Sequence, residues 1–388
     1  MKKQTLLIFS CVLALVVLGC DKDETSSFTS EDETLAGETV TAGDKDARYV
    51  KLFVLNEGSY GQNNSTLDFF RYSDGKYVRN SFSQMNPTIS AGLGDVGNDI
   101  AIRGDEAWIV VNNSGLVEIV SARDEKHIAT LEVPTPRNIV FDNEYAYVTS
   151  WAGAYYGGDA RKGAVYRIEL SNKTVKDTVN VGYQPEGIAL SGGNLYVANS
   201  GGVNPGGYEN TISIISQAEF KVTGSISLPS QKNLKDVVAS GGDLWVSSLG
   251  DYYSVHSGLA RINLATKQVN EYDDVRVGTR LWNDAANDKI YVIGTQDEWV
   301  WTPGAKKTYS IYMANTASGN ISEHSLPEGI TYPYSIAVDG VSGDIFIGDA
   351  ADSKTPGSIR CYDATYSLKW KATAGLFPGH FAFFDAKR

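Results

Sequence analysis

A short segment recurs along the chain and limits its possible folds more than any other feature. The segment has a turn-favouring residue, two variable residues and then an apolar pair. Clear copies lie at residues 97–101, 136–140, 185–189, 333–337 and 378–382, and weaker copies lie at 233–238 and 278–282. The spacing runs from 39 residues (97 to 136) to 55 residues (278 to 333), which is the size of one β-propeller blade.

Each blade-sized unit also has the strands that a blade needs. A second run of β-branched and aromatic residues follows the repeat, as in residues 195–198 (LYVA) and 244–247 (LWVS). Turn pairs such as Gly192-Gly193 separate the first and second runs and supply the positive φ angles of hairpin turns. Third runs alternate in polarity, and fourth runs are shorter and more polar, as expected at outer edges. No segment has a convincing 3.6-residue period, so we predict an all-β chain.

The two ends of the folded part complete each other. Residues 49–55 form a second strand without a first, and residues 381–384 form a first strand with nothing after it. Joined, they complete one blade and leave no exposed sheet edge. We therefore predict a seven-bladed β-propeller over residues 48–388, with a ring closed by N- and C-terminal strands that share one blade. Six or eight blades remain alternatives because the fifth and sixth units are weak.

The first residues have the pattern of a processed leader. Lys2 and Lys3 precede an apolar run over residues 6–18, which is too short for a bilayer span of roughly 20 residues. The run ends at residues 17–20 (VLGC), which resemble a bacterial lipobox with Cys20 as the lipidated residue. We expect a lipoprotein signal peptide over residues 1–19. A plain signal peptide or an uncleaved anchor is the alternative.

Residues 20–47 are rich in Ser, Thr, Glu and Asp and have no apolar periodicity, so we expect a flexible acidic tether. Its start, residues 21–24 (DKDE), resembles the surface-export signal of Bacteroidetes lipoproteins. The resemblance implies a lipid-anchored protein of the outer membrane that is exposed at the cell surface. An anchor that faces the periplasm is the alternative.

Charge and cysteine content argue against two other classes of protein. The formal net charge is -12, and no basic cluster is present of the kind that a nucleic-acid partner requires. Cys361 is the one cysteine in the predicted propeller, so an intramolecular disulfide cannot staple the fold. We expect Cys361 to be a small core residue.

The loops between second and third strands carry most of the candidate functional residues. In a propeller these loops gather at one mouth of the central channel, and several in this sequence are long: residues 56–64, 150–158, 199–208, 247–253 and 294–301. They combine Tyr and Trp with Gly, Ser and Asn, as in binding sites with rigid aromatic anchors and adaptable hydrogen-bonding neighbours. Packing of the same aromatics against the tops of the blades is the alternative.

Signals for an enzyme are few. His256 lies in a long loop and His380 at the start of a repeat, so both can reach the mouth. The sequence has no metalloprotease histidine motif and no serine-hydrolase elbow. Glu57, Asn199 and Asp349 follow second strands and would be the ligands of a metal-assisted lactonase. We expect a binding protein with no catalytic residues, metal or cofactor.

Two segments near the start of the propeller resemble a known family. Residues 52–58 (LFVLNEG) and 63–67 (NNSTL), with the repeated Pro-x-x-Ile-Ala and the run at 195–199 (LYVAN), resemble YncE-like surface propellers of Bacteroidetes lipoproteins. Within that group the chain is most similar to the BtuG-type cobalamin-binding lipoproteins. The resemblance implies capture of a corrinoid (vitamin B12) at the propeller mouth and transfer to an outer-membrane TonB-dependent transporter.

A corrinoid is broad and rimmed with amides, so a mouth lined by aromatic and amide side chains would bury its faces and satisfy its rim. We expect aromatic contacts from Trp151, Tyr155, Tyr156, Tyr208, Tyr252, Trp299 and Trp301. Arg137 and Arg280 would contact the nucleotide phosphate, unless they form salt bridges within the loops. The rival hypotheses are a surface glycan- or protein-binding adhesion propeller and a metal-dependent lactonase-like hydrolase.

Overall fold

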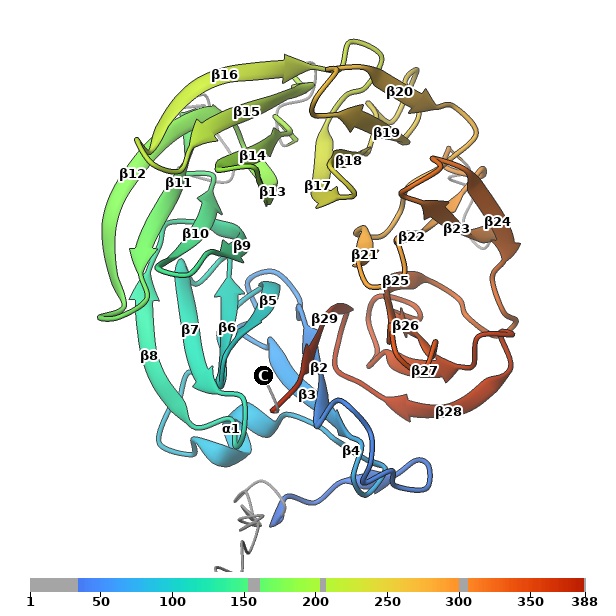
Figure 1. Cartoon of the computed structure of the whole chain (residues 1–388). Helices are drawn as coiled ribbons and strands as arrows, with labels where there is room; N and C mark the ends of the chain where they lie inside the picture. The colour runs from blue at the N-terminus through green and yellow to red at the C-terminus, as the bar shows by residue number, and fades with distance from the viewer. Residues whose placement is uncertain (1–33, 153–160, 203–206, 300–305, 387–388) are drawn as a thin grey trace, which may run out of the picture.

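The described part of the chain is a ring of seven β-sheets around a central axis (Figure 1). The computed structural model describes residues 34–152, 161–202, 207–299 and 306–386. Each sheet is one blade, and adjacent strands pair antiparallel, as in blade 4. These residues contain a single helix, α1 (Ser81–Met85). The predicted seven-bladed β-propeller is confirmed.

Blade 1 closes the ring with both ends of the chain. Its sheet has the order β1 (Glu38–Thr39), β4 (Lys76–Val78), β3 (Thr66–Arg71), β2 (Lys51–Asn56) and β29 (Pro378–Phe384). The inner strand β29 pairs with β2 along its length, with Phe384 opposite Lys51 and Pro378 opposite Asn56. The closure predicted from the two unpaired ends is therefore confirmed.

The other six blades each use four consecutive strands, which run in chain order from the channel outward. Blade 2 is β5 (Gly97–Arg103), β6 (Glu106–Val111), β7 (Leu116–Ser121) and β8 (His127–Glu132). Blade 3 is β9 (Pro136–Phe141), β10 (Tyr145–Ser150), β11 (Lys162–Glu169) and β12 (Thr174–Tyr183). Blade 4 is β13 (Pro185–Ser191), β14 (Asn194–Asn199), β15 (Thr211–Ser216) and β16 (Lys221–Ser227). Blade 5 is β17 (Leu234–Ser240), β18 (Asp243–Ser248), β19 (Gly258–Asn263) and β20 (Val269–Tyr272). Blade 6 is β21 (Trp282–Asp284), β22 (Lys289–Thr295), β23 (Tyr309–Asn315) and β24 (Ile321–Ser325). Blade 7 is β25 (Pro333–Val338), β26 (Ile345–Asp349), β27 (Ser358–Tyr362) and β28 (Leu368–Thr373).

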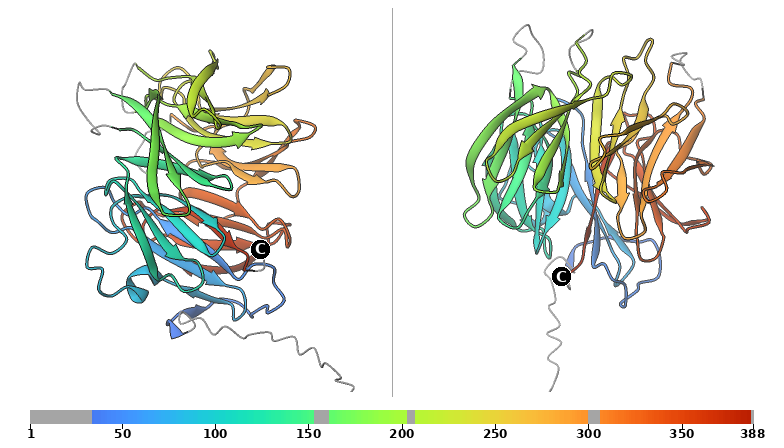
Figure 2. Two further views of the ribbon diagram at one scale, coloured as in Figure 1. Left: turned by 60° about the vertical axis from the view of Figure 1, so that its left-hand side comes forward. Right: turned by 45° about the horizontal axis from the view of Figure 1, so that its top comes forward.

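The two faces of the ring carry different connections. At one face of the ring the inner strands begin and the second strands end, and we call it the mouth face. The mouth face holds the loops between second and third strands and the links between blades. The opposite face, the turn face, holds short turns such as Gly192-Gly193, where φ is 56° and 75° and glycine is free of steric cost. β1 and the end of β29 lie at the turn face (Figure 2).

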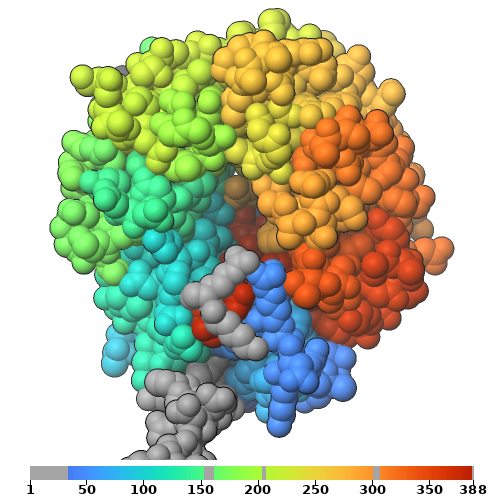
Figure 3. Space-filling view, in the orientation of Figure 1, coloured from blue at the N-terminus to red at the C-terminus, as the bar shows by residue number. Residues whose placement is uncertain are grey.

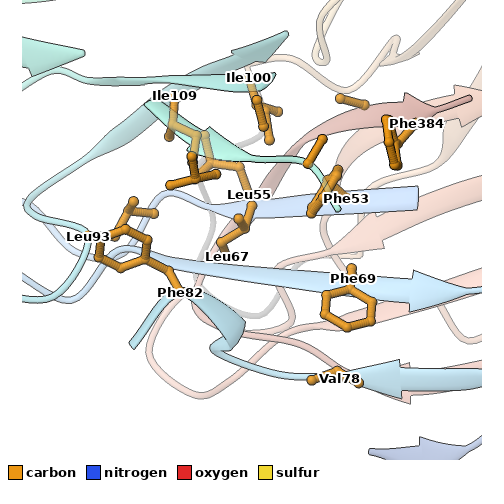
Figure 4. Close-up of a cluster of buried hydrophobic side chains, with 14 of the residues drawn as sticks. Phe53, Leu55, Leu67, Phe69, Val78, Phe82, Leu93, Ile100, Ile109 and Phe384 are labelled. Atoms are coloured by element: carbon orange, nitrogen blue, oxygen red, sulfur yellow. The ribbon is translucent and has the colours of Figure 1, made fainter. Parts of the chain in front are cut away.

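The apolar core is divided among the interfaces between blades. Between blades 1 and 2, Phe53 and Leu55 of β2 pack in one cluster with Ile109 of β6 and with Phe82 of α1 (Figure 4). Second strands are continuous apolar runs because both of their faces are covered. The fourth strands β8 and β16 are mostly exposed. Cys361 of β27 is fully buried, which confirms its predicted place in the core.

The predicted flexible tether over residues 20–47 is wrong in its second half. From Thr34 on the chain lies against blade 1, where β1 pairs with β4 and so covers the outer edge of the sheet. Leu35 and Val40 pack against core clusters, and the Asp44 N–H donates to the Tyr72 carbonyl at 2.7 Å. The two apolar residues and the free edge of β4 anchor a segment whose composition alone indicates a coil.

Residues 1–33, which include Cys20 and the predicted signal peptide, lie outside the described residues. Within the described ranges, no helix has the length and apolar character needed to cross a membrane.

Candidate functional site at the channel mouth

A β-bulge recurs where the inner strands begin. In six blades the register between the first and second strands shifts at the mouth end, for example between Pro185 and Ile188 in blade 4 and between Pro333 and Ser335 in blade 7. A bulge bends the strand and re-aims the side chains beside it. The two variable positions of the sequence repeat lie at this level, so residues from different blades meet at the mouth.

The residues at these two positions are mostly polar. They are Asn98, Asp99, Arg137, Asn138, Glu186, Gly187, Lys235, Asp236, Thr279, Arg280, Tyr334, Ser335, Gly379 and His380. A pocket of about 160 Å³ is lined by several of them together with Glu57 and Leu249. Figure 3 shows the ring from the opposite side, the turn face, where its centre is also hollowed. A second pocket of about 120 Å³ adjoins Asp99, Arg280 and His380.

Arg280 bridges blades on opposite sides of the channel. Its Nη1 donates to Asp99 Oδ1 at 2.9 Å, and its Nε donates to Asp236 Oδ2 at 3.3 Å. Burial by itself would lower the pKa of Arg280, but the charges of Asp236 and Asp99 raise it above its ordinary value. Arg280 is therefore a permanent cation whose charge is used within the chain.

Glu57, His380 and Tyr334 form a second cluster at the mouth. The Tyr334 hydroxyl donates to Glu57 Oε2 at 2.7 Å, and His380 Nε2 lies 3.1 Å from Glu57 Oε1. Burial raises the pKa of Glu57, but hydrogen bonds from His380 and Tyr334 outweigh it and hold the pKa below its usual value. Glu57 is therefore an ionised hydrogen-bond acceptor at neutral pH.

Arg137 and Trp151 pack together at the edge of the mouth. The Arg137 Nε and Nη2 atoms donate to Glu186 Oε2 at 3.1 and 3.0 Å. The Arg137 guanidinium lies 4.5 Å from the centre of the Trp151 ring, which is only 6% exposed. Lys235 Nζ lies 3.7 Å from the same Glu186 oxygen, and the Lys235 side chain is part-exposed. Trp151 therefore packs against the Arg137–Glu186 ion pair. This agrees with the alternative interpretation, in which the loop aromatics pack against the tops of the blades.

The charges at the mouth are paired with one another. Each of the carboxylates of Glu57, Asp99, Glu186 and Asp236 lies beside an Arg, Lys or His side chain. A ligand with strong net charge would have to disrupt these pairs, whereas a neutral polar group can hydrogen-bond to them. The mouth therefore suits amide or hydroxyl groups.

Beside the channel opening, on the same mouth face, a loop of blade 5 presents two tyrosines. Asp251 Oδ1 accepts the N–H groups of Tyr253, Ser254 and Val255 at 3.0, 2.7 and 2.8 Å. The hydrogen bond from Lys232, with these N–H groups, holds the pKa of Asp251 well below its usual range. The loop is ordered by an ionised side chain, and Tyr253 on it is 81% exposed.

The neighbouring Tyr252 connects this loop to the mouth and to blade 4. It is 40% exposed, and its hydroxyl accepts a hydrogen bond of 3.3 Å from the amide of Asn233, the residue just before β17. Its ring lies edge-on to Tyr208 at 6.2 Å between centroids. Tyr208 and Tyr252, two of the predicted aromatic residues, are thus brought together.

Trp299 lies on the loop of blade 6 and stacks on His256 of blade 5. The ring centroids are 3.8 Å apart at an angle of 10°. Glu298 holds the arrangement because its Oε2 lies 2.7 Å from His256 Nδ1 and its Oε1 accepts the Ser257 N–H at 3.2 Å. One face of the Trp299 indole is covered by His256, and the side chain remains 37% exposed.

The exposed apolar side chains of the described residues are segregated by type. All the large exposed aromatics, Tyr60, Tyr252, Tyr253, Trp299 and Tyr332, lie on loops or links of the mouth face. The exposed aliphatic residues lie on fourth strands, with Val341 on a turn of the turn face as the exception. Exposed aromatics concentrated on one face are typical of a binding surface.

The predicted site residues are only partly gathered at this face. Tyr252 and Trp299 are exposed there and Tyr208 is half-buried, whereas Trp151 is buried and Arg137 and Arg280 are engaged in ion pairs. Tyr155, Tyr156 and Trp301 lie outside the described residues.

The three ligands of the metal-dependent alternative do not converge. Asn199 bonds Gly182, Thr211 and Ser213, and Asp349 accepts N–H groups of the link before β25. Among the described residues, no three His, Cys, Asp or Glu side chains form a group suited to a metal ion. Asn199 and Asp349, at the ends of second strands, instead hydrogen-bond to the segment that leads into their own blade.

Sequence reasoning expected that His380 can reach the mouth and considered Glu57 only as a metal ligand. It missed Tyr334, the contact of these three residues and the exposed Tyr253. A usable signal was present for the cluster, because Tyr334 and His380 occupy the variable positions of the repeat. No comparable signal marks Tyr253, whose exposure depends on the Asp251 hydrogen bonds.

Residues 51–376 match the model of a protein family described as Domain of unknown function (DUF5074). The chain belongs to this family. No curated protein matches the sequence. The DUF5074 chain is similar to a quinonprotein alcohol dehydrogenase-like protein from Bacteroides thetaiotaomicron, with a TM-score of 0.60 and 13% identity over 86% of this chain and 78% of the other.

It is also similar to hydrazine synthase of Kuenenia stuttgartiensis, with a TM-score of 0.59 and 18% identity over 74% of this chain and 89% of that chain. At these identities the two solved structures support the propeller fold of this DUF5074 protein and nothing about its activity.

Proposed function

We propose that this protein is a binding propeller without catalytic activity, a surface lipoprotein of the BtuG type. In this proposal it captures a corrinoid at the mouth face and passes it to an outer-membrane TonB-dependent transporter. The observation that carries the proposal is the concentration of every large exposed aromatic of the described residues on that face.

The shape and chemistry of the mouth face support a broad ligand with apolar faces and an amide rim. Tyr252, Tyr253 and Trp299 offer ring surface on two neighbouring blades, held by Asp251 and Glu298. Because residues 251–255 are held by hydrogen bonds to Asp251, little ordering entropy would be lost there on binding. Paired charges in the channel suit carboxamides.

Lys235 is a better candidate than Arg137 or Arg280 for contact with a ligand phosphate. Both arginines form close hydrogen-bonded ion pairs, whereas Lys235 lies 3.7 Å from Glu186, lines the mouth pocket and is part-exposed. A Lys ammonium can turn from one partner toward another because its three donors rotate freely.

Calorimetric and spectral titration of the purified protein with cyanocobalamin tests the proposal. We expect binding, and we expect Trp299→Ala and Tyr253→Ala each to weaken it by about tenfold, as for aromatic anchors at interfaces. Tyr366→Ala, in a third-to-fourth turn of the turn face, is the matched control and leaves the affinity unchanged.

The absence of heat and of a spectral change at micromolar protein would contradict corrinoid capture. If the same aromatic variants then abolished binding to a surface glycan, the face would be a glycan-binding site, since rings of Tyr and Trp also stack on sugars.

A further inference from the structure

Another pocket lies on the turn face, far from the mouth loops. It has a volume of about 280 Å³ and lies between the N-terminal segment 41–48, blade 1 and blade 7. We call it the turn-face pocket. Its size is near the lower limit of ligand pockets, which are roughly 300–1,000 Å³, so a small ligand or a single head group would fill it.

One wall of the turn-face pocket is aromatic. Tyr72, Phe70 and Trp370 line it, and their rings form a continuous row with Phe70 centred 4.9 Å from Tyr72 and 4.7 Å from Trp370. Phe70 and Trp370 are buried, while Tyr72 is half-buried. Tyr72 is thus the member of the row that presents most ring surface to the pocket.

The rim of the turn-face pocket carries excess negative charge. Its cations are Arg48 and Lys369, and its carboxylates are Asp44, Asp46, Asp339 and Asp344. Lys369 Nζ lies 2.6 Å from Asp344 Oδ2, and Arg48 Nε lies 3.2 Å from Asp385 Oδ2. Because both cations already have acidic partners, Asp44, Asp46 and Asp339 leave the rim negative.

The aromatic wall and the negative rim of the turn-face pocket together select one class of ligand. An anion is repelled by the carboxylates. A hard metal cation requires six or more oxygen ligands, but Asp339 Oδ1 already accepts the N–H groups of Val341 and Ser342 at 2.8 and 3.2 Å. An alkylammonium group is attracted both by carboxylates and by the faces of aromatic rings, and its larger radius suits a wall of rings.

We propose that the turn-face pocket binds a small organic ammonium group, with Tyr72 as its aromatic contact and Asp44, Asp46 and Asp339 as its counter-charges. The ammonium group belongs either to a free amine or to a lipid head group, since the pocket opens on the face that carries the N-terminal segment. This site is independent of the proposed function of the mouth.

Calorimetry of the purified protein with choline, and sedimentation with phosphatidylcholine vesicles, tests the proposal and distinguishes the two sources. We expect saturable binding of choline, and we expect the double variant Asp44→Asn/Asp339→Asn to weaken it about tenfold or more. The amide that replaces the Asp339 carboxylate keeps an oxygen that can hold the turn. Asp288→Asn removes the same charge from an exposed turn on the same face and leaves binding unchanged.

Tyr72→Leu should weaken choline binding as well, while Tyr72→Phe retains it because the ring remains. Vesicle binding that is lost in the same variants would identify a lipid source, and choline binding alone would identify a free amine. The proposal is overturned if neither probe binds, or if Asp288→Asn weakens binding as much as the double variant. Cyanocobalamin titration of each variant should be unchanged.

Discussion

The mouth face and the turn face are built from the same strands, yet they differ in almost every connection. The turn face repeats short turns at positive φ, as at Gly192, Gly193 and Asp288. The mouth face has loops of different length, bulges at the inner strands, buried ion pairs and the exposed aromatics. Strand pairing requires tight turns only at the turn-face ends of the strands. The loops at the mouth face can differ in length because the ring already fixes the two strands that each loop joins.

The largest expected effect on the free energy of unfolding comes from the ion pairs at the mouth. Arg280→Met should lower the free energy of unfolding by about 3–5 kcal/mol, because Asp99 and Asp236 would remain buried without their partner. Urea denaturation measures the change. The triple variant that also carries Asp99→Asn and Asp236→Asn should recover part of the loss. A loss below about 1 kcal/mol for Arg280→Met would show that the channel charges are solvated.

Glu57→Gln should cost about 2 kcal/mol at neutral pH, because Tyr334 and His380 donate to a charged acceptor. The pKa of Glu57 is lower in the folded chain than its ordinary 4.5, so its stabilising effect is present above that pH and is lost as the pH falls through the lowered value. Urea midpoints at pH 7 and pH 3 should therefore differ more in the wild type than in the variant. The exposed Glu328→Gln should change neither midpoint.

On the turn face, Gly193→Ala should cost about 1 kcal/mol, because φ there is 75° and a Cβ disfavours that region. Space is not the cause, since no atom lies within 4 Å of the added Cβ. Gly224→Ala, in strand β16, should be neutral or slightly stabilising. Thermal denaturation compares the two, and ligand binding at the mouth should be the same in both. An altered affinity in Gly193→Ala would mean that the two faces are coupled.

The smallest effect on stability is expected at the most exposed aromatic. Tyr253→Ala should change the free energy of unfolding by no more than about 0.5 kcal/mol, because the side chain is 81% exposed and its loop is held by Asp251. Thermal denaturation measures this. A larger loss would show that Tyr253 packs within the protein and is unavailable to a ligand.

The strands could be predicted better than the site. The repeat identified seven blades, and unpaired runs at the two ends indicated the shared blade, because pairing in a propeller depends mainly on local periodicity. The site residues depend on contacts between distant segments. Arg280 and Asp99 are far apart in sequence, and no local pattern pairs them. Trp151 was expected to be a ligand contact, but it is buried and packs against Arg137.

The sequence by itself determined the class of architecture, since the alternation of apolar and turn residues specifies strands and turns locally and favours a ring of seven blades. It also marked the mouth loops as aromatic. Only the tertiary structure decided which aromatics are exposed, which charges are paired and where residues 34–47 lie. Those outcomes depend on the closed ring, which brings residues of different blades within a few ångströms and removes water from some of them.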